Sequence, residues 1–148
     1  MGAGGAARGV LAPLLNEKPA SMVVVNRTQS KAKELAEYFS DLGNISGCGY
    51  EHLMGRQFDL IINATAASLQ GELPPLPDKL VSAKGCCYDM MYGQQTPFMQ
   101  WAVQQGVKTI VDGLGMLVEQ AAESFYIWRD VRPDTNAVLA VLRKTIST

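Results

Sequence analysis

The sequence is poor in histidine and cysteine, the side chains that most often bind metal ions. His52 is the only histidine, and the three cysteines stand at positions 48, 86 and 87. This number and spacing do not fit a zinc site, and neighbouring cysteines rarely pair because their side chains point to opposite faces of a strand. We therefore expect no metal site and three reduced thiols, as in a cytoplasmic protein.

The chain also lacks a charge bias and long apolar runs. Its 13 Lys and Arg nearly balance 14 Asp and Glu. Without a basic excess, binding to nucleic acid or to an anionic membrane surface is not expected. No apolar run is long enough to span a bilayer, and the N-terminus fits neither a secretory signal nor a myristoylation motif. These absences leave a globular protein of 148 residues, enough for one domain with a sizeable core.

What the chain does contain is an alternation of short apolar runs with helical patterns. The alternation predicts an α/β fold with a Rossmann-like, doubly wound parallel sheet, because buried parallel strands need helices on both faces. A pair of terminal helices, joined near 131–133, predicts a C-terminal helical hairpin. Strands are expected at 22–25, 46–49, 58–62, 85–90 and 107–111, and helices at 7–15 (limited by Pro13), 28–39, 50–54, 97–105, 114–128 and from Asp134 through Arg143.

A glycine-rich stretch opens the chain. Residues 2–7, Gly-Ala-Gly-Gly-Ala-Ala, fit the dinucleotide fingerprint G-x-G-x-x-G/A, in which a glycine turn and a helix N-terminus hold a pyrophosphate. The fingerprint normally follows a buried central strand, but here only Met1 precedes it. We therefore expect a fragment whose sheet lacks its first strand. Its neighbours would have unpaired edges, which predicts a closed-up sheet, a strand from another copy, or an aggregation-prone chain.

A cationic strand end follows the glycines by about twenty residues. A cofactor with a free ribose 2′-hydroxyl usually meets Asp or Glu there, but this chain has Asn26-Arg27-Thr28 and, nearby, Lys31. Arg27 and Lys31 can pair with a dianionic 2′-phosphate, which predicts NADP over NAD. The alternative is that Arg27 is a solvated loop charge.

Ligands of such sheets bind at the C-terminal ends of the strands. Polar residues or glycine also stand at the other strand ends: Asn63-Ala64-Thr65, Asp89 to Tyr92, and Asp112-Gly113. The motifs occur in this order, together with Thr96-Pro97-Phe98, residues 112–117 (DGLGML) and residues 120–122 (QAA). As a set they resemble the C-terminal, cofactor-binding half of shikimate dehydrogenase. That family reduces 3-dehydroshikimate to shikimate with NADPH, on the chorismate route to aromatic amino acids.

The resemblance also implies roles for single residues. The pyrophosphate would lie on Gly2, Ala3, Gly4, Gly5 and Ala6, and the adenosine phosphate between Asn26, Arg27, Thr28 and Lys31. Thr65, Met90 and Gly113 would line the nicotinamide pocket, and Tyr92 and Gln120 would contact the substrate. Without the resemblance, Met90 would be a core residue and Gln120 a solvated surface residue, whereas Tyr92 would be either a packing residue or a ligand.

The substrate domain of the family, with its Lys-Asp catalytic pair, has no counterpart in this chain. We therefore name no catalytic residue, and we expect one NADP-binding domain (1–148) that is inactive alone. Its last helices, about 114–148, would pack toward the substrate domain, and their exposure could cause a homodimer or non-native self-association. The alternatives are a quinate/shikimate dehydrogenase with broader substrate choice, a non-catalytic NADP-binding module, and a remnant that binds nothing.

Overall fold

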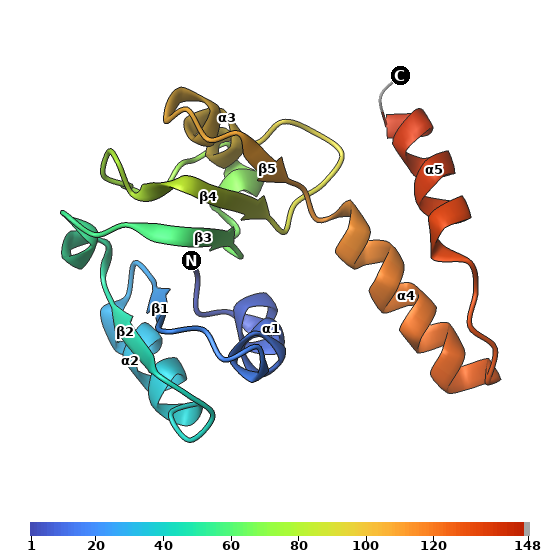
Figure 1. Cartoon of the computed structure of the whole chain (residues 1–148), viewed down its shortest axis with the longest axis horizontal. Coiled ribbons are helices and arrows are strands. Elements are labelled where there is room, and N and C mark those ends of the chain that lie inside the picture. Colours follow the sequence, from blue (N-terminus) through green and yellow to red (C-terminus); the bar gives the residue numbers. More distant parts are fainter. Residues whose placement is uncertain (147–148) are drawn as a thin grey trace.

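A computed structural model describes residues 1–146, apart from the side chains at 68 and 69. Parallel strands alternate with helices along this part of the chain, as the apolar pattern predicts (Figure 1). The elements are α1 (Gly5–Asn16), β1 (Met22–Val25), α2 (Gln29–Tyr38), β2 (Ile45–Cys48), η1 (Tyr50–Leu53), β3 (Phe58–Asn63), η2 (Ala67–Gln70), β4 (Val81–Asp89), α3 (Pro97–Gln104), β5 (Thr109–Val111), α4 (Leu114–Arg129) and α5 (Thr135–Ile146).

The strands form two parallel ladders, β1–β2 and β3–β4–β5. Met1 and Gly2 lie between them. The α-amino group of Met1 donates to the Ile62 carbonyl (2.6 Å), and the Met1 carbonyl accepts from the Ala64 N–H (3.0 Å). The Gly2 N–H donates to the Val25 carbonyl (2.7 Å). The predicted sheet without its first strand is thus confirmed, and the two ladders have not closed on each other.

Two apolar cores cover the two faces of the sheet, as expected of a doubly wound fold. The first joins α1, α2 and β1, with Leu15 and Ala32 at its centre. The second joins α3 and η1 to the strands, with Phe98 and Leu53 almost fully enclosed. Val24 packs into the first core and its neighbour Val25 into the second, because successive side chains of a strand point to opposite faces.

Two element boundaries differ from the sequence-based expectation. Helix α1 continues through Pro13 to Asn16, because Leu11 and Leu15 pack into the first core on either side of the proline and compensate for its missing N–H. Strand β4 begins at Val81, before the apolar run at 85–90. The exposed Lys84 hides this first half from a search for apolar runs.

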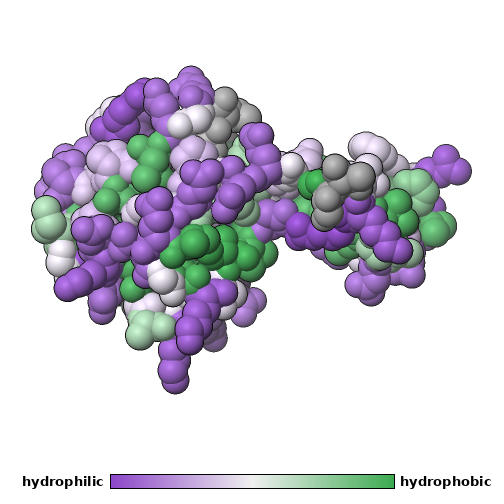
Figure 2. Space-filling view, turned by 90° about the horizontal axis from the view of Figure 1, so that it is seen from above, coloured by the Kyte–Doolittle hydropathy of each residue, from purple (hydrophilic) through white to green (hydrophobic). Residues whose placement is uncertain are grey.

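Helices α4 and α5 form the predicted hairpin, which stands apart from the sheet (Figure 1) and makes a separate lobe in space-filling view (Figure 2). The Asp134 carboxylate accepts from the Asn136 N–H (3.0 Å), so it caps α5 as expected. Arg143 of α5 pairs with Asp112 at the end of β5 through two hydrogen bonds, of 2.6 and 2.5 Å. Within residues 1–146, no helix has both the length and the hydropathy needed to cross a bilayer.

Candidate functional site

The glycine turn before α1 has the shape of a phosphate cradle. Gly2 has φ +97°, and a Cβ there would lie 2.8 Å from the Ala64 carbonyl oxygen, so only glycine fits. A Cβ added to Gly4 or Gly5 would meet nothing within 4 Å. The backbone of these two glycines is therefore open to an incoming group.

The N-terminus of α1 provides donors for that group. The first helical hydrogen bond runs from the Arg8 N–H to the Gly4 carbonyl (3.0 Å), so the N–H groups of Gly5, Ala6 and Ala7 precede the helical ladder. The first turn carries no acidic side chain, and Gly4 makes no side-chain cap. Free N–H groups and the helix dipole together favour an anion, which is what a pyrophosphate requires.

A cleft of about 1070 Å³ lies in front of this turn. It brings together sequence-predicted residues that are far apart in the chain. Its lining includes Gly2, Ala3, Gly4, Gly5 and Ala6 from the turn, Asn26 and Arg27 from the end of β1, and Thr65 from the end of β3. The cleft thus combines an anion cradle with a cationic strand end.

The strand end after β1 is arranged by a local hydrogen bond, in which the Asn26 side-chain amide donates to the Thr28 carbonyl (3.0 Å). Arg27 is exposed and lines the cleft. Thr28 is the N-cap position of α2 but makes no side-chain cap bond, and Lys31 is exposed in the first turn. Thr28 and Lys31 do not line the cleft, so the structure brings only Asn26 and Arg27 of the predicted clamp to it.

The sequence analysis missed one wall of the cleft. Tyr50, Glu51 and Met54, from η1 and the residue after it, line the cleft together with the proline-rich stretch 72–77. Burial raises the pKa of Tyr50, and the nearby charge of Arg27 partly offsets this. The strand-end rule would have found this wall, since η1 directly follows β2.

A buried polar network joins the ends of β3 and β4. The Asp89 carboxylate accepts from the Asn63 side-chain amide (3.2 Å), the Thr96 hydroxyl (2.5 Å) and the Met91 N–H (3.0 Å). The side-chain oxygen Oδ1 of Asn63 accepts from the Thr65 hydroxyl (2.7 Å). Asn63, Asp89 and Thr96 are each at most 1% exposed. This network fixes Thr65 at the rim of the cleft, and the sequence analysis did not assign Thr96 to it.

The other predicted site residues lie outside the cleft lining. Gly113 approaches the backbone of Met90 so closely that a Cβ would overlap the Met90 carbonyl, and the Gly113 N–H donates to the Met91 carbonyl (2.9 Å). Met90 and Gly113 are therefore direct neighbours. Tyr92 and Gln120 are exposed.

Within residues 1–146, neither the thiols nor the histidine belongs to a group of side chains that could bind a metal ion. Cys48, Cys86 and Cys87 are free, and burial raises the pKa of Cys87 to about 12. His52 is exposed, with Nδ1 2.9 Å from a carboxylate oxygen of Glu51. Among residues 1–146, no three His, Cys, Asp or Glu side chains are grouped so that they could hold a metal ion.

Two family models match the chain. Residues 1–70 match "Shikimate / quinate 5-dehydrogenase", and residues 113–143 match "Shikimate 5'-dehydrogenase C-terminal domain". The shikimate dehydrogenase (NADP(+)) of Cellvibrio japonicus is 60% identical over 147 residues, which are 99% of this chain and 53% of the relative.

Solved structures agree with the sequence matches. An Ael1 enzyme from Pseudomonas putida superposes with a TM-score of 0.85 at 46% identity, over 95% of this chain and 52% of its own. A shikimate dehydrogenase in complex with NADP+ superposes with a TM-score of 0.77 at 28% identity, over 99% of this chain and 53% of its own. The chain thus spans about half the length of the curated relatives it matches.

Proposed function

We propose that the chain is the NADP-binding half of an enzyme of the shikimate dehydrogenase family, whose curated members it matches over about half of their length. One observation carries this proposal: the glycine turn and Arg27 line the same cleft. The first can hold a pyrophosphate and the second a ribose 2′-phosphate, and NADP contains both groups.

In the proposed complex, the N–H groups at the start of α1 bind the pyrophosphate. The Arg27 guanidinium pairs with the 2′-phosphate and Asn26 adds a hydrogen bond. We assign a further hydrogen bond to Thr28, which directly follows Arg27 although it lies outside the cleft lining. Lys31 lies one turn into α2 and adds a second positive charge to this end of the cleft. No acidic residue occupies the strand end, so nothing there selects for a free 2′-hydroxyl as in NAD.

The nicotinamide end of the cofactor is assigned to Thr65, Met90 and Gly113. The network of Asn63, Asp89 and Thr96 fixes Thr65, and Met90 supplies an apolar thioether surface for a planar ring. When bound, NADPH supplies the hydride of the reaction. The residues of this chain orient the ring and exclude water from one side of it.

For the whole enzyme we propose reduction of 3-dehydroshikimate to shikimate, with Tyr92 and Gln120 contacting the substrate. Both side chains are exposed and have room for a ligand. Residues 1–148 form one cofactor domain, and the lobe of α4 and α5, with the exposed Ile127 and Trp128, packs toward a substrate domain. The three free thiols fit a cytoplasmic location.

The test is a pair of calorimetric titrations, with NADP and with NAD, of the wild-type chain and of Arg27→Gln. Loss of a charge-assisted contact to a phosphate should weaken NADP binding about 10- to 100-fold and leave NAD binding unchanged. Lys108→Gln, which removes one exposed positive charge away from the cleft, is the matched control and should change neither. An unchanged preference in Arg27→Gln contradicts the proposal.

The same samples distinguish the alternatives. We expect NADP binding by the isolated chain without turnover of shikimate, because hydride transfer needs a complete, water-poor cleft. Measurable turnover would show that the chain is a complete catalyst. Absence of binding to either cofactor would favour a remnant that binds nothing.

A further inference from the structure

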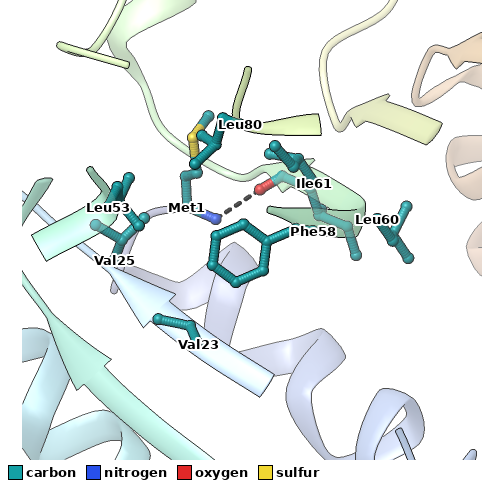
Figure 3. Close-up of a pocket in the computed structure, with 9 residues that line it drawn as sticks. Met1, Val23, Val25, Leu53, Phe58, Leu60, Ile61 and Leu80 are labelled. Carbon is teal, nitrogen blue, oxygen red and sulfur yellow. Dashed lines mark hydrogen bonds between the residues drawn. The ribbon is translucent and has the colours of Figure 1, made fainter. Parts of the chain in front are cut away.

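The buried polar side chains of the molecule are gathered in one place. Among the residues that the structure describes, the buried polar or charged ones are Asn63, Asp89 and Thr96, and they contact one another. The small cavity between β1 and β3 is different, because the side chains that line it are all apolar (Figure 3). Buried polar groups are costly unless each has a partner, so the fold concentrates a hydrogen-bond network at this one point.

The network lies where three neighbouring strands end. Strands β3, β4 and β5 are parallel neighbours, so their carboxyl ends meet at one edge of the sheet. Thr65 follows β3, Met90 follows β4 and Gly113 follows β5. These are the three residues assigned above to the nicotinamide, and Asp89 is the last residue of the middle strand.

On one side, Asp89 acts on Thr65 through Asn63. The Nδ2 group of Asn63 donates to the Asp89 carboxylate, 3.2 Å from Oδ1 and 3.3 Å from Oδ2. With its nitrogen held in this way, Asn63 presents Oδ1 to Thr65, where it accepts from the hydroxyl (2.7 Å) and from the backbone N–H (3.2 Å). Both the main chain and the side chain of Thr65 are therefore fixed.

On the other side, Asp89 acts through the main chain of Met91. Its Oδ1 accepts from the Met91 N–H (3.0 Å), and the Met91 carbonyl accepts from the Gly113 N–H (2.9 Å). A Cβ added to Gly113 would lie 2.1 Å from the Met90 carbonyl oxygen, so the two backbones are in direct contact. The turn after β4 and the start of α4 are thus connected to the same carboxylate.

Thr96 holds the carboxylate itself. Its hydroxyl donates to Oδ2 of Asp89 (2.5 Å) and accepts from the Met99 N–H (3.2 Å) at the N-cap of α3. Oδ2 is thereby turned toward α3, and Oδ1 faces Met91. The orientation of Asp89 therefore depends on the Thr96 hydroxyl.

We propose, on the basis of the NADP-binding function proposed above, that Asp89 and Thr96 are positioning residues for the nicotinamide ring. Asp89 holds Thr65 on one side of the ring site. On the other side it holds Met90 and Gly113, so the separation of the two sides is set before the cofactor binds. A preformed site suits hydride transfer, which needs a fixed ring orientation, because ordering the site during binding would weaken the affinity.

The experiment compares NADP with 2′-phospho-ADP-ribose, which has the same phosphates but lacks the nicotinamide. Calorimetric titrations give both affinities for the full chain and for its variants. Thr96→Val keeps the side-chain size and removes the hydroxyl, so we expect NADP binding to weaken about 3- to 10-fold and 2′-phospho-ADP-ribose binding to stay unchanged. Thr96→Ser keeps the hydroxyl and should retain the wild-type NADP affinity. The matched control Thr109→Val, at an exposed position of β5, should change neither affinity.

The two ligands separate this proposal from the NADP-binding function on which it rests. If neither ligand binds to the wild-type chain, the function fails and the positioning role fails with it. If both bind and Thr96→Val weakens both equally, the hydroxyl only caps α3 and the positioning role is wrong. An unchanged NADP affinity in Thr96→Val, or the same loss in Thr96→Ser, also contradicts it.

Amide hydrogen exchange of the wild-type chain gives a second measurement that needs no variant. In a preformed site the N–H groups of Thr65, Met91 and Gly113 are hydrogen-bonded without ligand. We therefore expect slow exchange at these three amides in the free chain and little further slowing with NADP. Fast exchange that becomes slow only after NADP is added would show that the ligand orders the site, and would overturn the proposal.

Discussion

The buried Asp89 carboxylate accepts hydrogen bonds from three residues. It is fully buried and accepts from Asn63, Thr96 and Met91, and so connects β3, β4 and α3. A buried carboxylate with several donors is well satisfied, whereas an unsatisfied group at the same place would be costly.

Replacement of Asp89 by asparagine should therefore destabilise the chain. The new amide presents N–H donors where the native network needs an acceptor, and we expect a loss of about 2–4 kcal/mol in the free energy of unfolding. Urea denaturation followed by circular dichroism measures it. Asp59→Asn is the control, since Asp59 is exposed and accepts from the Ser82 hydroxyl; it should cost less than about 1 kcal/mol. Equal losses in the two variants would contradict the role given to Asp89.

At the residue scale, local patterns in the sequence were enough to locate the glycine turn and Arg27, which line one cleft, while their binding roles stay predictions. The strand 22–25 and the turn at 50–54 were also located closely. Thr96 and the wall of Tyr50 and Met54 were not predicted, since their positions depend on how distant strands align. Thr28 and Lys31 follow the cleft-lining Arg27 closely in the sequence. Neither lines the cleft, because α2 directs the chain away from it.

Helix α5 depends on few contacts. It has no buried residue. The amphipathic pattern of the sequence predicted this helix but could not show what the helix packs against. The Asp112 side chain of the ion pair with Arg143 is 14% exposed, against 51% for Arg143. This pair ties the free end of the hairpin back to the end of β5.

Removal of that tie should loosen α5 while the sheet stays folded. For Arg143→Gln we expect faster amide exchange along α5 and a change of less than about 1 kcal/mol in global stability, because one partner is half exposed. Arg132→Gln is the matched control. Arg132 pairs with Glu123 at 2.8 Å, but both side chains are more than half exposed. If both variants change α5 exchange equally, the Asp112 contact has no special role.

The stability of the whole molecule should depend on pH through its first residue. Burial lowers the pKa of the Met1 α-amino group from 8.0 to about 6. Between these values the unfolded chain binds a proton that the folded chain does not, so stability rises as pH increases from 6 to 8. The contribution is on the order of 2 kcal/mol, complete above pH 8 and lost as the pH falls to about 6.

Urea denaturation at pH 6, 7 and 8 measures this dependence. The chain with an acetylated N-terminus is the control, because it has no α-amino group to titrate, and its stability should vary less across the same range. A native chain that is as stable at pH 6 as at pH 8 would show that Met1 is not buried between the ladders in solution.

The separation of the two ladders has a consequence for how the molecule unfolds. The second apolar core crosses from Val25 of β1 to Ile61 of β3, but the backbone hydrogen bonds that link the ladders belong to Met1 and Gly2. A continuous sheet transmits strain through every strand and tends to melt as one cooperative unit. Here side-chain packing in the second core couples the two halves with little backbone pairing between them, so thermal transitions followed in the two halves need not coincide.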